Sequence, residues 1–182
     1  MLKVVYLGTP EFAVPPLLKL IDYDCKITGV ISQPDRKKDR KGNLIDTPVK
    51  AAAQKSGLKV YQFEKIKDSC DDLRRLNADI FITCAYGQIL SQEVLNIPRY
   101  GVFNIHASLL PKYRGAAPVQ WALINGEKKT GVTIMKTDIG IDSGEILLQK
   151  EIDIKDNDTG GTLLQRLSLL GAEAITEALD II

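Results

Sequence analysis

Blocks of apolar residues separated by polar ones predict alternating strands and helices from the start of the chain. Residues 4–7 form a continuous apolar run that ends at Gly8, which is typical of a strand buried on both faces of a sheet. Residues 12–21 are apolar at helical spacing, behind Thr9 as a capping residue and a proline in the first turn. Residues 26–31 predict a second strand. The opening segment therefore predicts a β-α-β unit.

The same alternation continues to the end of the chain and predicts an α/β fold with a Rossmann-like, doubly wound, mostly parallel sheet. In such a sheet, ligands bind beyond the carboxyl ends of the strands, so candidate functional residues are sought there. Further strands are predicted over residues 58–61, 79–85, 101–105, 131–137 and 145–154, and further helices over residues 47–55, 66–76, 116–124 and from the Asp158-Thr159 cap onward.

The length of 182 residues suits one compact domain, residues 1–182, without an internal linker or repeat. The last predicted helix runs to Asp180-Ile181-Ile182 without Gly, Pro or a polar tail. An apolar helix end of this kind predicts a chain cut from a longer protein; a helix that docks at a natural terminus is the alternative.

Composition and charge narrow the class of protein. The chain is 45% hydrophobic and 26% charged, as in ordinary soluble proteins, and no apolar run approaches the ~18 residues that span a bilayer. Three scattered cysteines argue against a disulfide framework and suit a reducing compartment. We therefore expect a cytoplasmic, monomeric protein without a membrane partner. Because the formal net charge is only +1, any nucleic-acid contact must come from a local patch.

The single histidine of the chain, His106, lies directly after a predicted buried strand. Strand alternation places Asn104 and His106 on the same face at the carboxyl end, where an amide donor and an imidazole can meet one small electrophile. A lone histidine is structural about as often as it is catalytic. Position alone therefore leaves both interpretations open.

A second candidate is the loop of residues 138–145, which follows another predicted strand. Gly140 and Gly144 allow tight turns that could bring Asp142 close to a neighbouring strand end. An ordinary Asp-Gly turn between strands is the alternative. Spacing alone leaves open whether Asp142 meets His106.

A third candidate is basic: five of the six residues 36–41 are Lys or Arg. Such a patch can bind phosphates, and a solvated flexible loop is the alternative interpretation. No aromatic residue lies within it, so we expect no base stacking there. The five cations are Arg36, Lys37, Lys38, Arg40 and Lys41.

Several common motifs are missing from the sequence. There is no G-x-G-x-x-G after the first strand, no G-x-x-x-x-G-K-[ST] and no G-x-S-x-G, which weakens dinucleotide, nucleoside triphosphate and hydrolase hypotheses. One histidine and dispersed cysteines also argue against a zinc site, so we expect no metal.

Taken together, these motifs resemble those of the folate-dependent formyltransferase family. The first-loop motif and the basic segment look more like the branch that acts on tRNA. The resemblance covers nearly the whole chain and is carried by Gly8-Thr9-Pro10-Glu11-Phe12-Ala13, Gln33-Pro34-Asp35-Arg36, Asn104-x-His106, Ser108-Leu109-Leu110-Pro111-x-Tyr113-Arg114-Gly115 and Gly140-Ile141-Asp142-Ser143-Gly144.

The resemblance implies transfer of a formyl group from 10-formyltetrahydrofolate to the amine of methionyl initiator tRNA, in support of translation initiation and without a metal. Asn104 would donate a hydrogen bond to the formyl oxygen, and His106 would stabilise the same developing charge. Asp142 would orient the imidazole and help to remove the ammonium proton.

The same resemblance implies two segments that bind the folate and one that binds the tRNA acceptor end. The folate segments are Ser108, Leu109, Leu110 and Pro111, and Tyr86, Gly87, Gln88, Ile89 and Leu90. The tRNA segment contains Arg36, Lys37, Lys38, Arg40 and Lys41, with Arg40 in the position of an arginine of the tRNA-specific branch.

The tRNA-specific members carry a second, barrel-like C-terminal domain with a basic face for tRNA, and this chain ends before it. Residues 1–182 would then be the catalytic domain, whose own activity on tRNA is left open. Two alternatives remain. One is a formyltransferase for a small amine, such as an amino sugar nucleotide or glycinamide ribonucleotide. The other is a non-catalytic α/β module that binds a nucleotide or a protein partner, which predicts that Asn104, His106 and Asp142 lie scattered.

Overall fold

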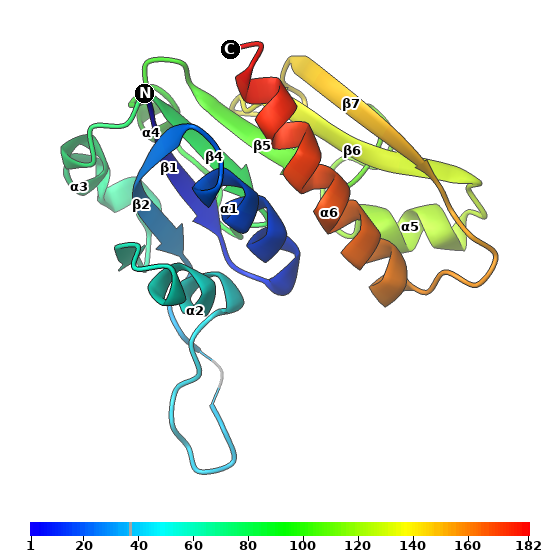
Figure 1. Cartoon of the computed structure of the whole chain (residues 1–182), viewed down its shortest axis with the longest axis horizontal. Coiled ribbons are helices and arrows are strands. Elements are labelled where there is room, and N and C mark those ends of the chain that lie inside the picture. Colours follow the sequence, from blue (N-terminus) through cyan, green and yellow to red (C-terminus); the bar gives the residue numbers. More distant parts are fainter. Residues whose placement is uncertain (37) are drawn as a thin grey trace.

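The computed structural model describes residues 1–36 and 38–182, in which seven strands form one sheet in the order β3-β2-β1-β4-β5-β6-β7 (Figure 1). The predicted Rossmann-like α/β fold is confirmed. The strands are β1 (Leu2–Gly8), β2 (Cys25–Ser32), β3 (Val60–Gln62), β4 (Ile80–Cys84), β5 (Val102–His106), β6 (Lys129–Lys136) and β7 (Ile146–Asp153). The helices are η1 (Glu11–Ala13), α1 (Val14–Ile21), α2 (Pro48–Lys55), η2 (Ile66–Asp68), α3 (Cys70–Arg75), α4 (Gln92–Leu95), α5 (Pro118–Ile124) and α6 (Gly160–Leu179).

The central strands are the continuous apolar runs of the sequence. All five residues of β4 are buried, as are the last five of β1, because helices cover both faces of the sheet. β1, β4 and β5 run parallel, with Gly8 opposite Cys84 and Thr83 opposite Asn104. Their carboxyl ends therefore meet at one edge of the sheet.

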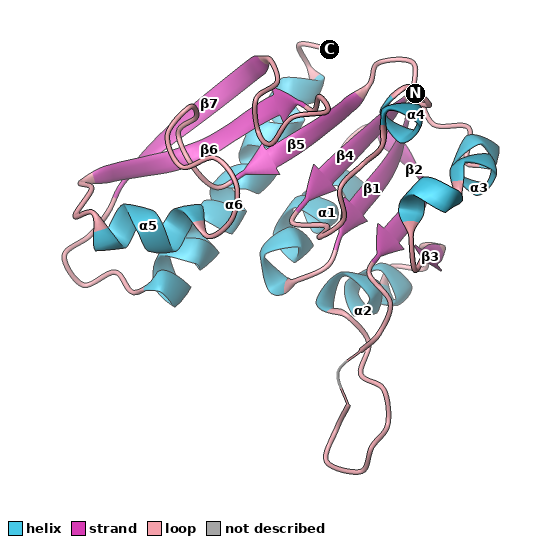
Figure 2. Ribbon diagram, turned by 180° about the vertical axis from the view of Figure 1, so that it is seen from behind, coloured by secondary structure: helices cyan, strands magenta, loops and turns pink. Residues whose placement is uncertain are grey.

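Helices lie on both faces of the sheet and enclose two apolar cores (Figure 2). On one face, Leu17 of α1, Ala53 of α2 and Leu167 of α6 belong to a single buried cluster. On the other face, Leu73 of α3 and Val94 of α4 belong to the second cluster. This two-sided cover is the doubly wound arrangement that the sequence predicts. No helix among the described residues is long and apolar enough to cross a membrane.

The sheet changes direction after β5, because β6 pairs antiparallel with β5 and β7 pairs antiparallel with β6. The strands β1 to β5 are parallel, so the sheet is mostly parallel as predicted, and β6 and β7 are its antiparallel part. Lys136, the last residue of β6, pairs with Phe103 near the beginning of β5. The loop of residues 137–145 therefore starts at the edge opposite to the carboxyl ends of the parallel strands, and the sequence does not predict that placement.

Two local predictions are wrong in detail. The helix predicted over residues 66–76 is broken into η2 and α3 at Ser69, whose backbone (φ −117°, ψ 25°) is not helical. Thr9 does not cap the first helix, since its Oγ1 donates to the carbonyl of Tyr86 at 2.8 Å and accepts from the backbone N–H of Gln33 at 3.2 Å. The hydroxyl instead joins the loops that follow β1, β2 and β4. The cap at Thr159 is confirmed.

A hairpin projects from the body of the molecule between β2 and α2 (Figure 1). We call residues 38–44 the basic hairpin: Lys38 pairs with Leu44 in an antiparallel bridge. Asp39 closes its turn by accepting from the N–H groups of Lys41 at 2.8 Å and Asn43 at 2.9 Å. The basic hairpin leaves the body on the side where the parallel strands end.

Candidate active site

Strand β5 presents Asn104 and His106 on the face of the sheet that carries α4. Val102, two residues earlier, belongs to the apolar core under α4, and strand alternation gives Asn104 and His106 the same direction. His106 is buried and Asn104 is half-buried. The strand thus delivers an amide and an imidazole to one location at its carboxyl end.

The amide of Asn104 is oriented by a neighbouring strand. Thr83 of β4 lies opposite Asn104 in the register, and its hydroxyl donates to Asn104 Oδ1 at 2.9 Å. Because the amide oxygen is held in this way, Nδ2 points away from β4 as a donor. It reaches Asp142 Oδ1 at 3.4 Å, a long contact that leaves the N–H group available to a better acceptor. No pattern in the sequence singles out Thr83.

Asp142 reaches the same location from the loop of residues 137–145. Its Oδ2 accepts from the backbone N–H of Gly115 at 2.8 Å and lies 3.4 Å from His106 Nδ1. Its side chain is 17% exposed. Asp142 also has a positive φ of 47°, a conformation that costs free energy in a residue other than glycine and is frequent at functional sites.

His106 faces an acceptor at each ring nitrogen. Nε2 lies 2.8 Å from the carbonyl oxygen of Tyr113, so it carries the proton and donates. Nδ1 faces the carboxylate of Asp142. Only the imidazolium form can donate to both acceptors, whereas the neutral ring with its proton on Nε2 turns a lone pair toward Asp142.

The two glycines of the Asp142 loop lie where there is little space for a side chain. A Cβ atom added to Gly144 would collide with the carbonyl oxygen of Lys136, and one added to Gly140 would collide with Ser143 Oγ. Neither glycine has a left-handed φ. Gly144 is required because backbone fills the space beside it, whereas the space beside Gly140 is filled by the Ser143 side chain. The loop can therefore fold back against β6 and bring Asp142 to β5.

The structure thus brings Asn104, His106 and Asp142 together from β5 and a distant loop. The binding-module hypothesis predicted scattered side chains, and the contacts of 3.4 Å between Asp142 and each partner are contrary to it. Their chemical roles stay predictions. Within the described residues, no group of three or more His, Cys, Asp or Glu side chains could hold a metal ion.

Next to this cluster, on the α4 face, is a cavity of about 330 Å³ that the sequence analysis did not predict. It lies between the end of α4, the beginning of β5 and the loop that carries Asp142. Thr137 on its wall has a buried Oγ1 without a partner among the described residues. The lining residues are Gln92, Leu95, Asn96, Gly101, Val102, Lys136, Thr137, Asp138, Ser143, Gly144 and Glu145.

The first predicted folate segment is firmly held in the scaffold. Ser108 is fully buried, and its hydroxyl donates to the carbonyl of Lys112 at 2.7 Å. Leu110 is also buried, and its N–H donates to Thr133 Oγ1 at 3.1 Å. Of the four predicted residues, Leu109 is half-buried and Pro111 is exposed. These last two have surface available to a ligand.

The second predicted folate segment, which follows β4, combines buried and exposed residues. Tyr86 and Leu90 are buried, Gly87 is exposed, and Ile89 is 85% exposed. Burial raises the pKa of the Tyr86 phenol to about 12, and its hydroxyl has no hydrogen-bond partner among the described residues.

Gln88 fixes this second segment to its neighbours. Its amide nitrogen donates to Gln33 Oε1 and to the carbonyl of Phe63, and its amide oxygen accepts from the N–H of Ile66. The loop after β4 is thereby tied to the loops after β2 and β3.

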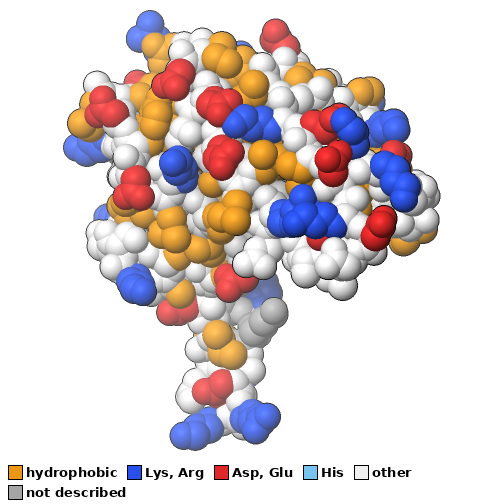
Figure 3. Space-filling view, turned by 45° about the vertical axis from the view of Figure 1, so that its right-hand side comes forward, with side chains coloured by type: hydrophobic (Ala, Val, Ile, Leu, Met, Phe, Trp, Pro, Cys, Tyr) orange, Lys and Arg blue, Asp and Glu red, His pale blue; other side chains and the backbone are white. Residues whose placement is uncertain are grey.

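The predicted tRNA-binding cations are exposed wherever the structure describes them. Lys38, Arg40 and Lys41 belong to the basic hairpin, and the space-filling view has blue side chains at the end of this projection (Figure 3). Arg36 lies nearer the body and pairs with Glu64 at 2.8 Å. Lys37 lies outside the described residues.

Comparison with known proteins places the chain in a family. The model of the family described as "Formyl transferase" matches residues 2–179. The chain belongs to the formyl transferase family. This formyl transferase chain is 54% identical over 179 residues to a protein from Thermodesulfovibrio yellowstonii named methionyl-tRNA formyltransferase, a match that covers 97% of the chain and 58% of the relative. It is 48% identical over 183 residues to the protein of the same name from Geobacter sulfurreducens, covering 100% of the chain and 58% of the relative.

Solved structures share the fold of the formyl transferase chain. Glycinamide ribonucleotide transformylase 1 from Symbiobacterium toebii superposes with a TM-score of 0.83 at 21% identity, over 98% of this chain and 86% of that one. A formyltetrahydrofolate deformylase from Pseudomonas syringae gives a TM-score of 0.78 at 21% identity, over 98% and 60% of the two chains. At such identities the likeness concerns the fold alone. The chain spans about 58% of the length of the curated relatives it matches.

Proposed function

We propose that this formyl transferase chain is the catalytic domain of an enzyme that moves the formyl group of 10-formyltetrahydrofolate to the free amine of methionyl initiator tRNA. The proposal depends above all on the cluster of Asn104, His106 and Asp142, whose 3.4 Å contacts join an amide, an imidazole and a carboxylate at the end of β5. The names of the relatives support the choice of acceptor.

The amine nitrogen attacks the formyl carbon, a C–N bond forms, and the formyl oxygen takes on negative charge. Asn104 Nδ2 is the first donor to that oxygen, because its long contact with Asp142 can be exchanged for a shorter bond to an anion. An imidazolium at His106 stabilises the same charge, with its ring held by Asp142 and the carbonyl of Tyr113.

Proton movement completes the transfer. The attacked intermediate carries an ammonium, and the carboxylate of Asp142 helps to take its proton. The bond between the formyl carbon and N10 of the folate then breaks, and N10 accepts a proton. The acceptor amine has lost one hydrogen and N10 has gained one, so the products are the formylated amine and tetrahydrofolate.

The folate would lie along the α4 face of β5. The cavity beside Asp142 suits its pterin end, because Leu95 and Val102 offer apolar contact while Thr137 Oγ1 offers a hydrogen-bonding group without a protein partner. Leu109, Pro111 and the exposed part of the loop after β4 would contact the remainder. In this proposal Ser108 and Leu110 act indirectly, because their hydrogen bonds hold the segment of residues 108–111 in place.

The basic hairpin would contact the acceptor end of the tRNA, since its exposed cations project from the edge at which the parallel strands end. A small amine has no need of such a projection, which is why the tRNA substrate is preferred to an amino sugar nucleotide or glycinamide ribonucleotide.

The test uses the protein at its natural length with 10-formyltetrahydrofolate labelled in the formyl group. Label should appear on methionyl initiator tRNA, with much lower rates for glycinamide ribonucleotide and for an amino sugar nucleotide. Labelling of a small amine alone would replace the proposed substrate. Labelling of no acceptor would favour the non-catalytic module.

A further inference from the structure

The basic hairpin is joined to the body through a compact group of polar side chains, which we call the neck: Ser32, Asp35, Thr47, Lys50 and Gln62. Asp35 lies in the segment that leads into the hairpin, and Thr47 and Lys50 lie in the segment that returns from it. Ser32 ends β2 and Gln62 ends β3.

Asp35 is the residue that joins the two segments. Its Oδ1 accepts from the backbone N–H of Thr47 at 3.1 Å and from Gln62 Nε2 at 2.9 Å. Its Oδ2 pairs with Lys50 Nζ. One carboxylate therefore connects the outgoing segment, the start of α2 and the end of β3.

The ion pair is shielded from solvent, with side-chain exposures of 11% for Asp35 and 17% for Lys50. Burial alone would raise the pKa of Asp35, but hydrogen bonds from Lys50, Gln62 and Thr47 outweigh it and hold that pKa below its ordinary value. A shielded pair with several further hydrogen bonds has one favoured geometry, unlike an exposed surface pair.

The neck is the place where the direction of the hairpin can be fixed. The hydrogen bonds of residues 38–44 that the structure describes are made within the hairpin, between Asp39, Asn43 and their neighbours. At its base, Thr47 caps α2 and its hydroxyl lies 2.5 Å from Ser32 Oγ. A small rotation at the base would displace the distant tip by much more.

The neck also connects with the strand ends that form the site. Gln62 Nε2 donates both to Asp35 and to the carbonyl of Gln33, and Gln33 in turn contacts Gln88 in the loop after β4. The N–H of Gln33 is bound by Thr9. These contacts thus fix the base of the hairpin relative to the edge of the sheet at which Asn104 and His106 lie.

We propose that Asp35 is a positioning residue that sets the direction of the basic hairpin, so that its cations meet the acceptor end of the RNA while the amine reaches the formyl group. This inference rests on the proposed function. It assigns a role to a carboxylate that carries the wrong charge for binding RNA directly.

Because Asp35 is negatively charged, electrostatics and positioning predict opposite changes in the KM for tRNA when the charge is removed. Asp35→Asn removes a negative charge near a polyanion, so electrostatics alone would lower the KM for tRNA. Positioning predicts the opposite. If the population of correctly directed hairpins falls to about a tenth, the KM for methionyl-tRNA rises about 10-fold, with kcat and the KM for 10-formyltetrahydrofolate close to wild type.

The partner of Asp35 gives a second pair of variants. Lys50→Met should raise the KM for methionyl-tRNA in the same way. Lys50→Arg, which keeps a cation opposite Asp35, should keep the KM close to wild type.

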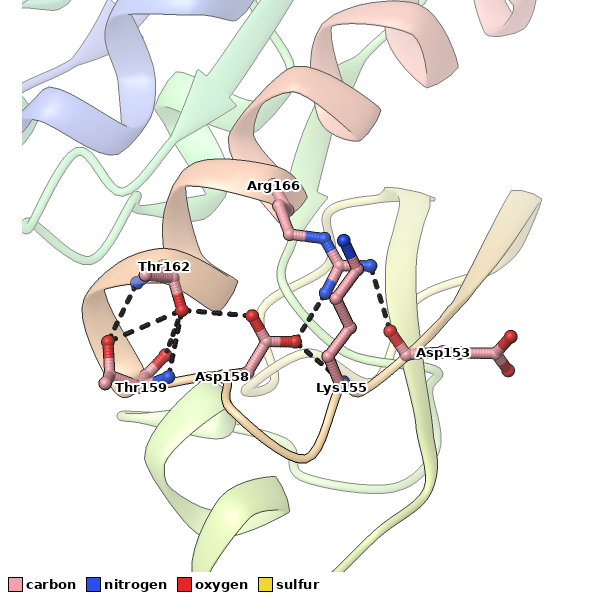
Figure 4. Close-up of polar contacts among 6 residues, drawn as sticks. All are labelled: Asp153, Lys155, Asp158, Thr159, Thr162 and Arg166. Atoms are coloured by element: carbon pink, nitrogen blue, oxygen red, sulfur yellow. Dashed lines mark hydrogen bonds and ion pairs between the residues drawn. The ribbon is translucent and has the colours of Figure 1, made fainter.

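Asp158 offers a matched control (Figure 4). Its carboxylate accepts from the N–H of Lys155 at 2.8 Å, from Thr162 Oγ1 at 3.0 Å and from Arg166 at 2.5 Å, and its side chain is 4% exposed. It follows β7, at the opposite edge of the sheet from β3. Asp158→Asn therefore removes a comparable buried carboxylate and should leave the KM for tRNA unchanged.

The experiment measures steady-state formylation by the protein at its natural length for wild type and the four variants. An unchanged or lowered KM for tRNA in Asp35→Asn would overturn the role of the neck. The same would follow if the folate KM rose equally, or if Asp158→Asn gave the same increase. If the wild-type protein does not formylate methionyl-tRNA at all, the proposed function fails first, and that result is distinct from the others.

Discussion

Among single residues, Thr83 orients the amide of Asn104 and lies behind it in the proposed site. It holds Asn104 Oδ1 and so directs Nδ2 into the site. Asn104→Ala should lower kcat by about 10²–10³-fold, because it removes the proposed donor to the formyl oxygen. Thr83→Val keeps the size of the side chain but frees the amide to rotate, and should lower kcat by up to about 10²-fold. Steady-state kinetics checks both values. Thr83→Ser restores the hydroxyl and should recover most of the rate; no recovery would refute the orienting role.

Asp142 contributes a negative charge beside His106 and a hydrogen bond that holds its own loop against Gly115. Asp142→Asn can still accept from the N–H of Gly115, so the loop should keep its position while the charge beside His106 is lost. We expect kcat to fall about 10²–10⁴-fold with little change in the thermal midpoint of unfolding. Asp156→Asn, at a fully exposed carboxylate, is the control for the loss of one negative charge. A large fall in thermal stability with an unchanged kcat would make Asp142 a structural residue.

For the elements, the first prediction concerns the basic hairpin. Arg40→Ala and Lys41→Ala should each weaken tRNA binding and reduce the slope of log K against log salt by about 1 per lost phosphate contact. The KM for 10-formyltetrahydrofolate should stay constant. Lys128→Ala, at an exposed cation beside β6, controls for net charge. Equal effects of all three substitutions would mean that the hairpin has no special part in binding.

The success of sequence-based prediction also differed between elements. β1 and β4 are continuous apolar runs, and the helix from Gly160 has an amphipathic period behind a capping threonine, so each was predicted from local pattern alone. The direction of β6 was not, because its buried residues form a continuous run, the pattern of a parallel strand covered on both faces, although β6 pairs antiparallel with β5. Asp142 could therefore be singled out from its loop, but its meeting with His106 depends on long-range pairing.

Short elements and backbone partners escaped prediction for a related reason. α4 has only four residues, too few for a period, although Ser91 accepts from the N–H of Val94 as a cap. The carbonyl of Tyr113 and the N–H of Gly115 hold the site, and every residue type has these groups. The cavity was missed because its walls come from α4, β5 and the Asp142 loop together.

For the whole molecule, two carboxylates that are shielded from solvent, Asp35 and Asp158, link stability to pH. Hydrogen bonds from the N–H of Lys155 and from other donors lower the pKa of Asp158, and the hydrogen bonds of the neck lower that of Asp35. Both folded-state pKa values lie below the ordinary 3.8. Their stabilising contribution is thus complete above the unfolded-state pKa and is lost as the pH falls through the lower folded values. Urea unfolding at a series of pH values should give a free energy of unfolding that drops below about pH 4. Asp158→Asn should flatten that drop, and an unchanged profile would contradict the assignment.

The bridge between Lys38 and Leu44 has a practical consequence for engineering. Antiparallel partners lie only about 5 Å apart at their Cα atoms, a gap that a two-residue turn such as Asn-Gly can close. Residues 39–43 can therefore be replaced as one unit while the pairing of Lys38 with Leu44 stays intact. Under the proposed function, grafts drawn from other nucleic-acid binders would change which RNA end the hairpin contacts and would leave the cluster of Asn104, His106 and Asp142 untouched.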